Sequence, residues 1–134
     1  MLYVRLHGVW STQLDLAYLS ELAETIRGMR GQSWSMIVDM REWVVPEAAK
    51  DPKYNVDLDS RNQKAEVWLV DHIDAQTHLL VHFENRPLQP KRFTEMGPLE
   101  AWLTTLQISL PAEIHDDIKL HTQANSHEVK KSEI

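Results

Sequence analysis

One pair of side chains in the sequence has the spacing of a metal-binding motif. His78 and His82 are four residues apart, so on an α-helix they lie on one face, where both rings can reach the same ion. Leu79 follows His78, so the glutamate of an HExxH motif is absent, and a metal site needs at least a third ligand. The pair supports a hypothesis of metal-assisted catalysis. The alternative is that the two histidines lie on a solvent-exposed helix face, titrate there and bind no metal.

Other catalytic and cofactor motifs are absent. The sequence has no Gly-x-Ser-x-Gly elbow, Walker loop or glycine-rich dinucleotide fingerprint, and only four glycines with which to bring backbone close to a phosphate. It has no cysteine, which removes disulfides, thiolate catalysis and cysteine-ligated zinc. We therefore name no catalytic residue and no cofactor. Whether the chain is an enzyme stays open, and the non-enzymatic interpretation is preferred.

The composition is typical of one acidic globular domain. The chain has 134 residues, of which 43% are hydrophobic and 25% charged, and its formal net charge is -6. An acidic surface repels phosphate backbones, so we expect no nucleic-acid partner. No apolar run approaches the roughly 20 residues that span a bilayer, and the N-terminal residues lack the pattern of a signal peptide. We therefore expect no membrane span and a cytoplasmic protein.

The periodicity of apolar residues predicts alternating strands and helices. The expected strands are Leu2–Gly8, Ser35–Met40, Ala65–Val70 and Leu88–Phe93. The expected helices begin at Ser11 or Thr12, at Asp71 and at Gly97, and the first of them ends near Gly28. Leu2–Gly8 alternates apolar and polar residues, whereas Ser35–Met40 is nearly continuous in apolar character.

One stretch allows two interpretations. Asp57–His72 can be a single long helix, with Thr77–Glu84 as the strand. We prefer the strand at Ala65–Val70, because its residues favour β-structure while Ile73–Asn85 has a helical period. In the preferred interpretation Val56–Lys64 is a polar helix that precedes this strand.

Alternating strands and helices predict a parallel sheet with right-handed crossovers. We expect one α/β domain over residues 1–107, with four mainly parallel strands in the order 2-1-3-4 and helices on both faces. Residues 108–134 are expected to form a C-terminal extension, with a short helix within Leu110–Ile118 and then a polar, frayed tail. We expect this extension to pack across a second copy of the chain.

This topology predicts a ligand outside the carboxyl ends of the strands, near the point where the strand order reverses. The candidate ligand-binding residues at that edge are Trp10, Ser11, Thr12, Arg41, Trp43, Asp71 and His72. Helix N-termini at this edge favour an anionic group. The alternative role of Ser11 and Asp71 is to cap the helices that follow them.

The five tryptophans divide into two groups. Trp68 and Trp102 lie on predicted apolar faces and are expected in the core. Trp10, Trp34 and Trp43 lie near element ends, where we expect partial exposure. Partly exposed aromatic side chains often anchor protein interfaces or apolar ligands, so the second group favours a binding surface at the carboxyl edge.

Three stretches carry a family resemblance. Gly8–Ser11 has a strand-end glycine followed by a small polar helix cap, Met36–Arg41 is an apolar strand that ends in aspartate, and Phe93–Leu103 has a closing strand and a helix ending in Ala-Trp-Leu. Together they resemble the STAS-like fold, in particular the SpoIIAA-like group related to anti-sigma-factor antagonists. The likeness spans about Leu2–Leu106 and concerns packing and capping, so it bears on fold more than on function.

The resemblance implies a non-enzymatic role, in which the chain binds a partner protein, a nucleotide or an apolar ligand. In this family the role is sometimes switched by phosphorylation of a serine at a helix start. The Asp59-Ser60 step is similar to the Asp-Ser step of the antagonists, which makes Ser60 a candidate phosphosite. The alternative is that Ser60 only lies on or near a helix start.

These observations predict a non-enzymatic cytoplasmic regulatory or protein-interaction module of the STAS-like type, which binds a partner protein or a second copy of itself as a homodimer. The second hypothesis is a protein that binds a small apolar or anionic ligand at the carboxyl ends of the strands. The third is a metal-assisted enzyme. A flat apolar patch at the strand ends favours the first hypothesis, and a concave pocket there favours the second. A third ligand that converges on His78 and His82 favours the third.

Overall fold

The computed structural model describes residues 1–47, 59–83 and 86–132, without the side chains of residues 81, 82 and 123–132. Its elements, in chain order, are β1 (Leu2–Val9), α1 (Thr12–Gly28), β2 (Trp34–Val44), β3 (Gln63–Leu69), the 3-10 helix η2 (Thr77–Phe83), β4 (Lys91–Phe93), α2 (Met96–Thr105) and α3 (Ala112–Ser132). The predicted α/β class and the parallel pairing of the four strands are confirmed.

The strands lie in the order β1-β2-β3-β4, so the predicted order 2-1-3-4 is wrong. The first strand is at an edge of the sheet and not in its interior. Burial explains the difference, because all seven residues from Trp34 to Met40 of β2 are buried whereas Leu6 is the only buried residue of β1. The sequence already indicated these positions. Alternating apolar and polar residues, as in Leu2–Gly8, are typical of a strand with one exposed face, and a continuous apolar run, as in Ser35–Met40, is typical of an interior strand.

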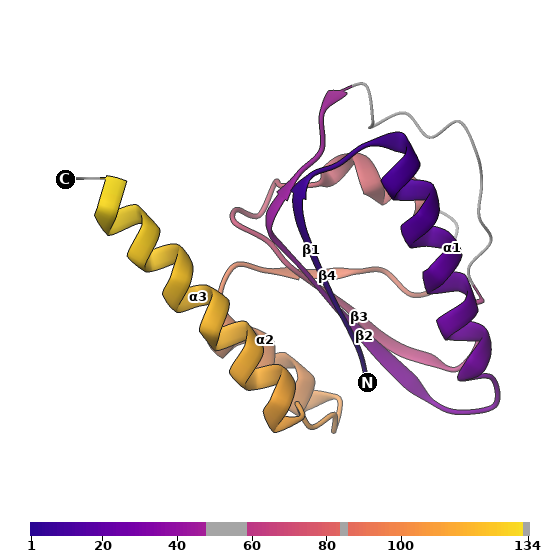
Figure 1. Ribbon diagram of the computed structural model, residues 1–134. Helices are drawn as coiled ribbons and strands as arrows, with labels where there is room; N and C mark the ends of the chain where they lie inside the picture. Colours follow the sequence, from indigo (N-terminus) through magenta and orange to yellow (C-terminus); the bar gives the residue numbers. More distant parts are fainter. Residues whose placement is uncertain (48–58, 84–85, 133–134) are drawn as a thin grey trace.

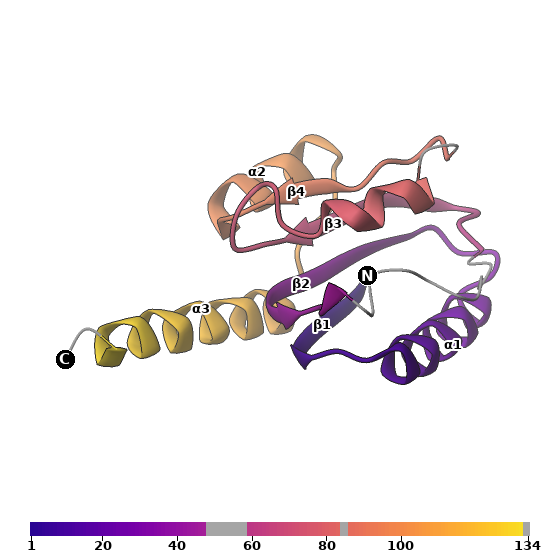
Figure 2. The ribbon, with the colours of Figure 1, turned by 90° about the horizontal axis from the view of Figure 1, so that it is seen from above.

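Each strand is added on the same side of the previous one, and right-handed crossovers then place α1 and η2 on the same face of the sheet. Figures 1 and 2 show the resulting layers, with α1 and η2 on one face of the sheet and α2 and α3 on the other. Two cores follow from these layers. One packs α1 against the sheet through residues that include Leu6, Leu22, Ile26, Val38 and Trp68. The other packs α2 and α3 against the sheet through Ile37, Val67, Leu69, Leu99, Leu103 and Ile118.

Helix α1 agrees with its prediction. Ser11 is the N-cap, and its side chain accepts a hydrogen bond from the backbone N–H of Leu14 at 3.2 Å. Thr12 is therefore the first residue of the helix and not its cap. Leu22 and Ile26 are buried on the face that meets the sheet, whereas Leu16, nearer the start of the helix, is exposed.

The segment from Asp59 to Phe83 overturns three expectations, one of which was the alternative interpretation. Gln63–Leu69 is a strand, so the alternative of one long helix over Asp57–His72 is wrong, as is a polar helix over the described part of Val56–Lys64. The helix expected after Asp71 is instead a series of turns followed by η2. Thr77, Leu80 and Phe83 recur every three residues, which is the period of a 3-10 helix.

Helix α3 is longer than predicted. It begins at Ala112, close to the expected start, but continues to Ser132 and takes in most of the segment predicted as a frayed tail. Ile118 is fully buried against the sheet, and the hydroxyl of Tyr3 donates to Asp117 at 2.7 Å. In Figures 1 and 2 the second half of α3 projects away from the sheet. None of the described helices has the length and apolar character needed to cross a membrane.

Candidate functional site

The seven residues predicted at the carboxyl edge do not form one site. The observed strand order has no reversal, so the topological switch point that defined the predicted site does not exist. The residues are divided between the two faces of the sheet, with Trp10 and Trp43 in the α1 core and Arg41 in contact with α3. We therefore describe the two groups separately.

The tryptophans at this edge are packing residues. The rings of Trp10 and Trp43 meet edge to face at 5.6 Å, and Trp10 also meets Tyr18 at 6.1 Å. Trp34 and Trp43 are buried and Trp10 is half-buried, so the expected exposure of this group is wrong for two of its three members. The indole N–H groups of Trp10 and Trp43 are buried without a hydrogen-bond partner among the described residues.

Arg41 fastens α3 to the sheet. Its Nε and Nη2 donate to the two carboxylate oxygens of Asp39 at 2.9 and 2.8 Å, and Nη2 also donates to the carbonyl oxygen of Ile118 at 3.0 Å. The side chains of Arg41 and Asp39 are only 8% and 3% exposed. Nη1 of Arg41 also contacts the hydroxyl of Thr122. These contacts give Arg41 a structural role that spacing alone did not indicate.

Asp71 and His72 are exposed just after β3. Burial raises the pKa of the Asp71 carboxyl above its ordinary value, and the nearby positive charge of Arg41 opposes this shift. Asp71 does not cap a helix, because η2 begins only at Thr77. Ser11 and Thr12 lie at the start of α1, where Ser11 has the capping role given as its alternative.

The metal-site hypothesis required His78 and His82 to lie on one face of an α-helix, and they do not lie in an α-helix. His78 lies in η2, and a 3-10 helix has three residues per turn, so positions four apart do not stack on one face. The side chain of His82 lies outside the described residues. The described part of the chain contains no group of three or more histidine, aspartate or glutamate side chains arranged to hold a metal ion.

Several exposed apolar side chains lie at or shortly after the carboxyl ends of strands. Val9 and Val44 are neighbours in the register of β1 and β2, and they are 68% and 56% exposed. Leu14 in the first turn of α1 and Ile73 after β3 are also exposed. We call Val9, Leu14, Val44 and Ile73 the apolar rim. Such residues favour contact with another macromolecule, because covering them removes apolar surface from water.

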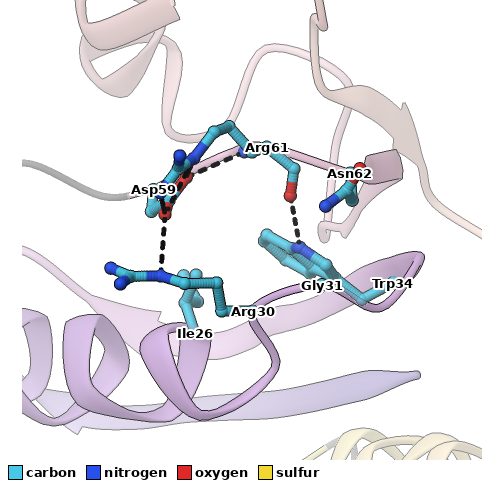
Figure 3. Close-up of a pocket in the computed structure, with 7 residues that line it drawn as sticks. All are labelled: Ile26, Arg30, Gly31, Trp34, Asp59, Arg61 and Asn62. Carbon is cyan, nitrogen blue, oxygen red and sulfur yellow. Dashed lines mark hydrogen bonds and ion pairs between the residues drawn. The ribbon is translucent and has the colours of Figure 1, made fainter.

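A pocket of about 220 Å³ lies at the opposite, amino end of the sheet (Figure 3). It lies between the loop that joins α1 to β2 and the turn that precedes β3. The residues that line it are Ile26, Arg30, Gly31, Trp34, Asp59, Arg61 and Asn62. Sequence analysis missed this site, because only the strand register Trp34↔Gln63 brings the two loops together.

Charged side chains form one wall of this pocket. The carboxylate of Asp59 accepts from Nε of Arg61 at 3.0 Å and from Nη2 at 2.7 Å, while Nε of Arg30 lies 3.9 Å away. The hydrogen bonds from Arg61 hold the pKa of the Asp59 carboxyl well below its usual range. On the other side, the indole N–H of Trp34 donates to the carbonyl oxygen of Arg61 at 3.0 Å. The pocket therefore combines two guanidinium groups, one carboxylate and an aromatic wall.

Ser60, the candidate phosphosite, is exposed in the turn beside this pocket. Its carbonyl oxygen accepts from the backbone N–H of Gln63 at 3.1 Å, immediately before β3 begins. Ser60 thus precedes a strand, and the alternative that placed it at a helix start is wrong. Its phosphorylation stays a prediction.

Comparisons of the chain with protein-family models, curated proteins and solved structures found no match. The STAS-like resemblance therefore stays a prediction that rests on Gly8–Ser11, Met36–Arg41 and Phe93–Leu103. The function has to be argued from the carboxyl edge and from the pocket.

Proposed function

We propose that the chain is a non-enzymatic cytoplasmic regulatory or protein-interaction module of the STAS-like type, which associates with a second copy of itself through the apolar rim. The observation that carries the proposal is the exposure of Val9 and Val44 side by side at the ends of β1 and β2. A homodimer with twofold symmetry uses the same patch on both copies, so the two valines of one copy meet those of the other.

The small-ligand hypothesis at the carboxyl ends ranks second. It calls for a concave pocket at that edge, whereas the pocket described above lies at the amino end. The indole rings of Trp10 and Trp43, which favoured a ligand site in the sequence, pack in the core under α1. The metal-assisted enzyme ranks third, because its two histidines lose the shared helix face.

Sedimentation velocity over a wide range of protein concentrations tests the proposal. We expect the wild-type chain to form a dimer and the double variant Val9→Asp/Val44→Asp to stay monomeric, because two carboxylates on the rim resist burial. The matched control is Leu120→Asp, which changes an exposed leucine on α3 and should leave the dimer intact. A wild-type chain that is monomeric at every concentration, or a dimer that survives the double variant, contradicts the proposal.

Native mass spectrometry of the protein as purified separates the first hypothesis from the second. A dimer without added mass agrees with the proposal. A small molecule retained by the wild-type protomer and lost on changing Asp71 and His72 to alanine instead supports a ligand site at the carboxyl edge.

A further inference from the structure

We propose that the pocket at the amino end of the sheet binds a small oxyanion, the carboxylate or phosphate group of a small molecule, through Arg30 and Arg61. This inference is independent of the apolar rim, which lies at the other end of the strands. It assigns a ligand class to a site that sequence patterns did not indicate.

The local charge supports an anion. The chain as a whole carries a formal net charge of -6, yet the charged residues that line this pocket are two arginines and one aspartate. Guanidinium groups match carboxylate and phosphate groups with paired N–H donors. The pocket is thus a positive site on an acidic molecule.

The guanidinium groups of Arg30 and Arg61 have more N–H donors than Asp59 accepts from. Asp59 engages Nε and Nη2 of Arg61 and approaches Nε of Arg30. In Figure 3 the two terminal nitrogens of Arg30 lie on the side away from Trp34 and Asn62, and they have no hydrogen-bond partner among the described residues. A guanidinium group has five N–H donors, so Arg30 keeps a complete pair of free donors. The Arg30 side chain is 62% exposed, so a change of rotamer can turn this pair towards an anion in the pocket.

The walls of the pocket are held in place before any ligand arrives. Asp59 accepts from the backbone N–H of Arg61 at 3.1 Å and so fixes the turn, while Trp34 holds the carbonyl oxygen of Arg61. Ile26 and Trp34 are buried, which makes the floor rigid and partly apolar. Gly31 has a φ of +87°, a conformation that other residues rarely adopt, and its missing side chain leaves that side of the pocket open.

The size of the pocket limits the ligand. Its volume of about 220 Å³ is below the roughly 300–1,000 Å³ of pockets that hold drug-sized molecules. The fitting ligand is therefore a small molecule with one oxyanion and a short or flat apolar body. Because Asp59 stays beside the bound anion, we expect binding in the millimolar range.

The test is a titration of the ¹⁵N-labelled chain of residues 1–134, followed by NMR. Sodium phosphate and sodium benzoate are the two probes, and sodium chloride at matched ionic strength is the control. The reporters are the indole N–H of Trp34 and the backbone N–H groups of Gly31 and Asn62. We expect saturable shifts of these signals with at least one probe and none with chloride. Phosphate alone indicates recognition of a phosphate group, and benzoate alone indicates an apolar carboxylate.

Three variants connect the shifts to the geometry. Arg30→Gln should weaken binding about threefold to fivefold, as expected for loss of an exposed charge contact. Arg27→Gln is the matched control, because Arg27 is exposed in the last turn of α1 but does not line the pocket. Asp59→Asn should strengthen binding, because it removes the competing carboxylate and keeps the amide oxygen that fixes the turn. Absence of saturable shifts, or equal affinity in Arg30→Gln and wild type, overturns the proposal.

Discussion

Two carboxylates are buried among the residues that the structure describes, and their surroundings differ. Asp39 is paired with the guanidinium group of Arg41. Among the described residues, Glu66 accepts hydrogen bonds only from neutral donors, Nε2 of Gln63 at 3.1 Å and the indole N–H of Trp68 at 2.9 Å. The charge of Arg86 acts on Glu66 without a hydrogen bond. The charge of Arg41 offsets the free-energy cost of burying the Asp39 carboxylate. The neutral donors of Glu66 leave most of the corresponding cost in place. The two residues therefore respond in opposite ways to substitution.

Replacing Arg41 by methionine should destabilise the fold by about 3–5 kcal/mol, because it leaves the Asp39 carboxylate buried without a partner. Urea denaturation measures this change in the free energy of unfolding. The double variant Asp39→Leu/Arg41→Met should recover most of the loss, since an apolar pair has no charge to desolvate. Arg61→Met, at an exposed ion pair, is the control and should cost only a small fraction of that amount. Equal losses in the two arginine variants would contradict the structural role of Arg41.

Glu66→Gln should stabilise the protein at neutral pH. Burial raises the pKa of the Glu66 carboxyl, and the hydrogen bonds from Gln63 and Trp68 only partly oppose this shift. A raised pKa means that the folded state binds the proton more tightly than the unfolded state does, so the ionised carboxylate costs stability at pH values above the folded pKa. This cost should disappear as the pH falls towards the ordinary value of about 4.3.

The measurement is the difference in unfolding free energy between Glu66→Gln and wild type at pH 8 and near pH 4. The advantage of the variant should be present at the higher pH and lost at the lower one. Glu24→Gln, which changes an exposed glutamate on α1, is the matched control. An advantage that does not depend on pH would show that ionisation of Glu66 is not its cause.

At the scale of elements, the sequence correctly predicted the helix and the strand whose signals come from residues close together in the chain. The cap at Ser11 and the end near Gly28 both identified α1. The strand at Ala65–Val70 was identified by its β-favouring residues. The length of α3 was missed, because its contacts with the sheet come from Tyr3 and Arg41, which are distant in sequence and gave no local signal.

Helix α3 is anchored by one buried isoleucine, and this gives a prediction. Ile118→Ala should destabilise the protein by about 2–5 kcal/mol, the usual range for such a cavity in a core. Leu120→Ala, on the same helix but exposed, should change stability by less than about 0.5 kcal/mol. Thermal or urea unfolding of the two variants checks the difference. Similar values for both would mean that α3 is not packed on the sheet as described.

At the scale of the whole molecule, the arrangement of strands limited what sequence analysis could predict about the site. Parallel pairing followed from the alternation of strands and helices. The position of the first strand was predicted wrongly, although the alternation of Leu2–Gly8 indicated an edge strand. One error in strand order created a switch point and assigned Trp10, Arg41 and Asp71 to one ligand. The pocket around Arg30 and Asp59 was missed for the related reason that two loops meet only through the register of β2 and β3.

The same long-range packing bears on the predicted boundary between a domain at residues 1–107 and an extension at 108–134. Ile118 belongs to the core that covers Ile37 and Leu69, so the start of the extension completes one layer of the fold. Thr122 is the last residue of α3 whose side chain is described, and its hydroxyl is in contact with Nη1 of Arg41. We therefore expect a chain ending at residue 122 to fold, and a chain ending at residue 107 to lose cooperative unfolding.

Thermal unfolding followed by circular dichroism, together with binding of a dye for exposed apolar surface, tests this expectation. The chain of residues 1–122 should melt cooperatively near the temperature of the full chain, because it keeps Ile118 and the contacts of Arg41. The chain of residues 1–107 should melt broadly and bind the dye, because the sheet face at Ile37 and Leu69 loses part of its cover. If the shorter chain instead melts as sharply as the full one, α3 is an appendage to a domain that is complete without it.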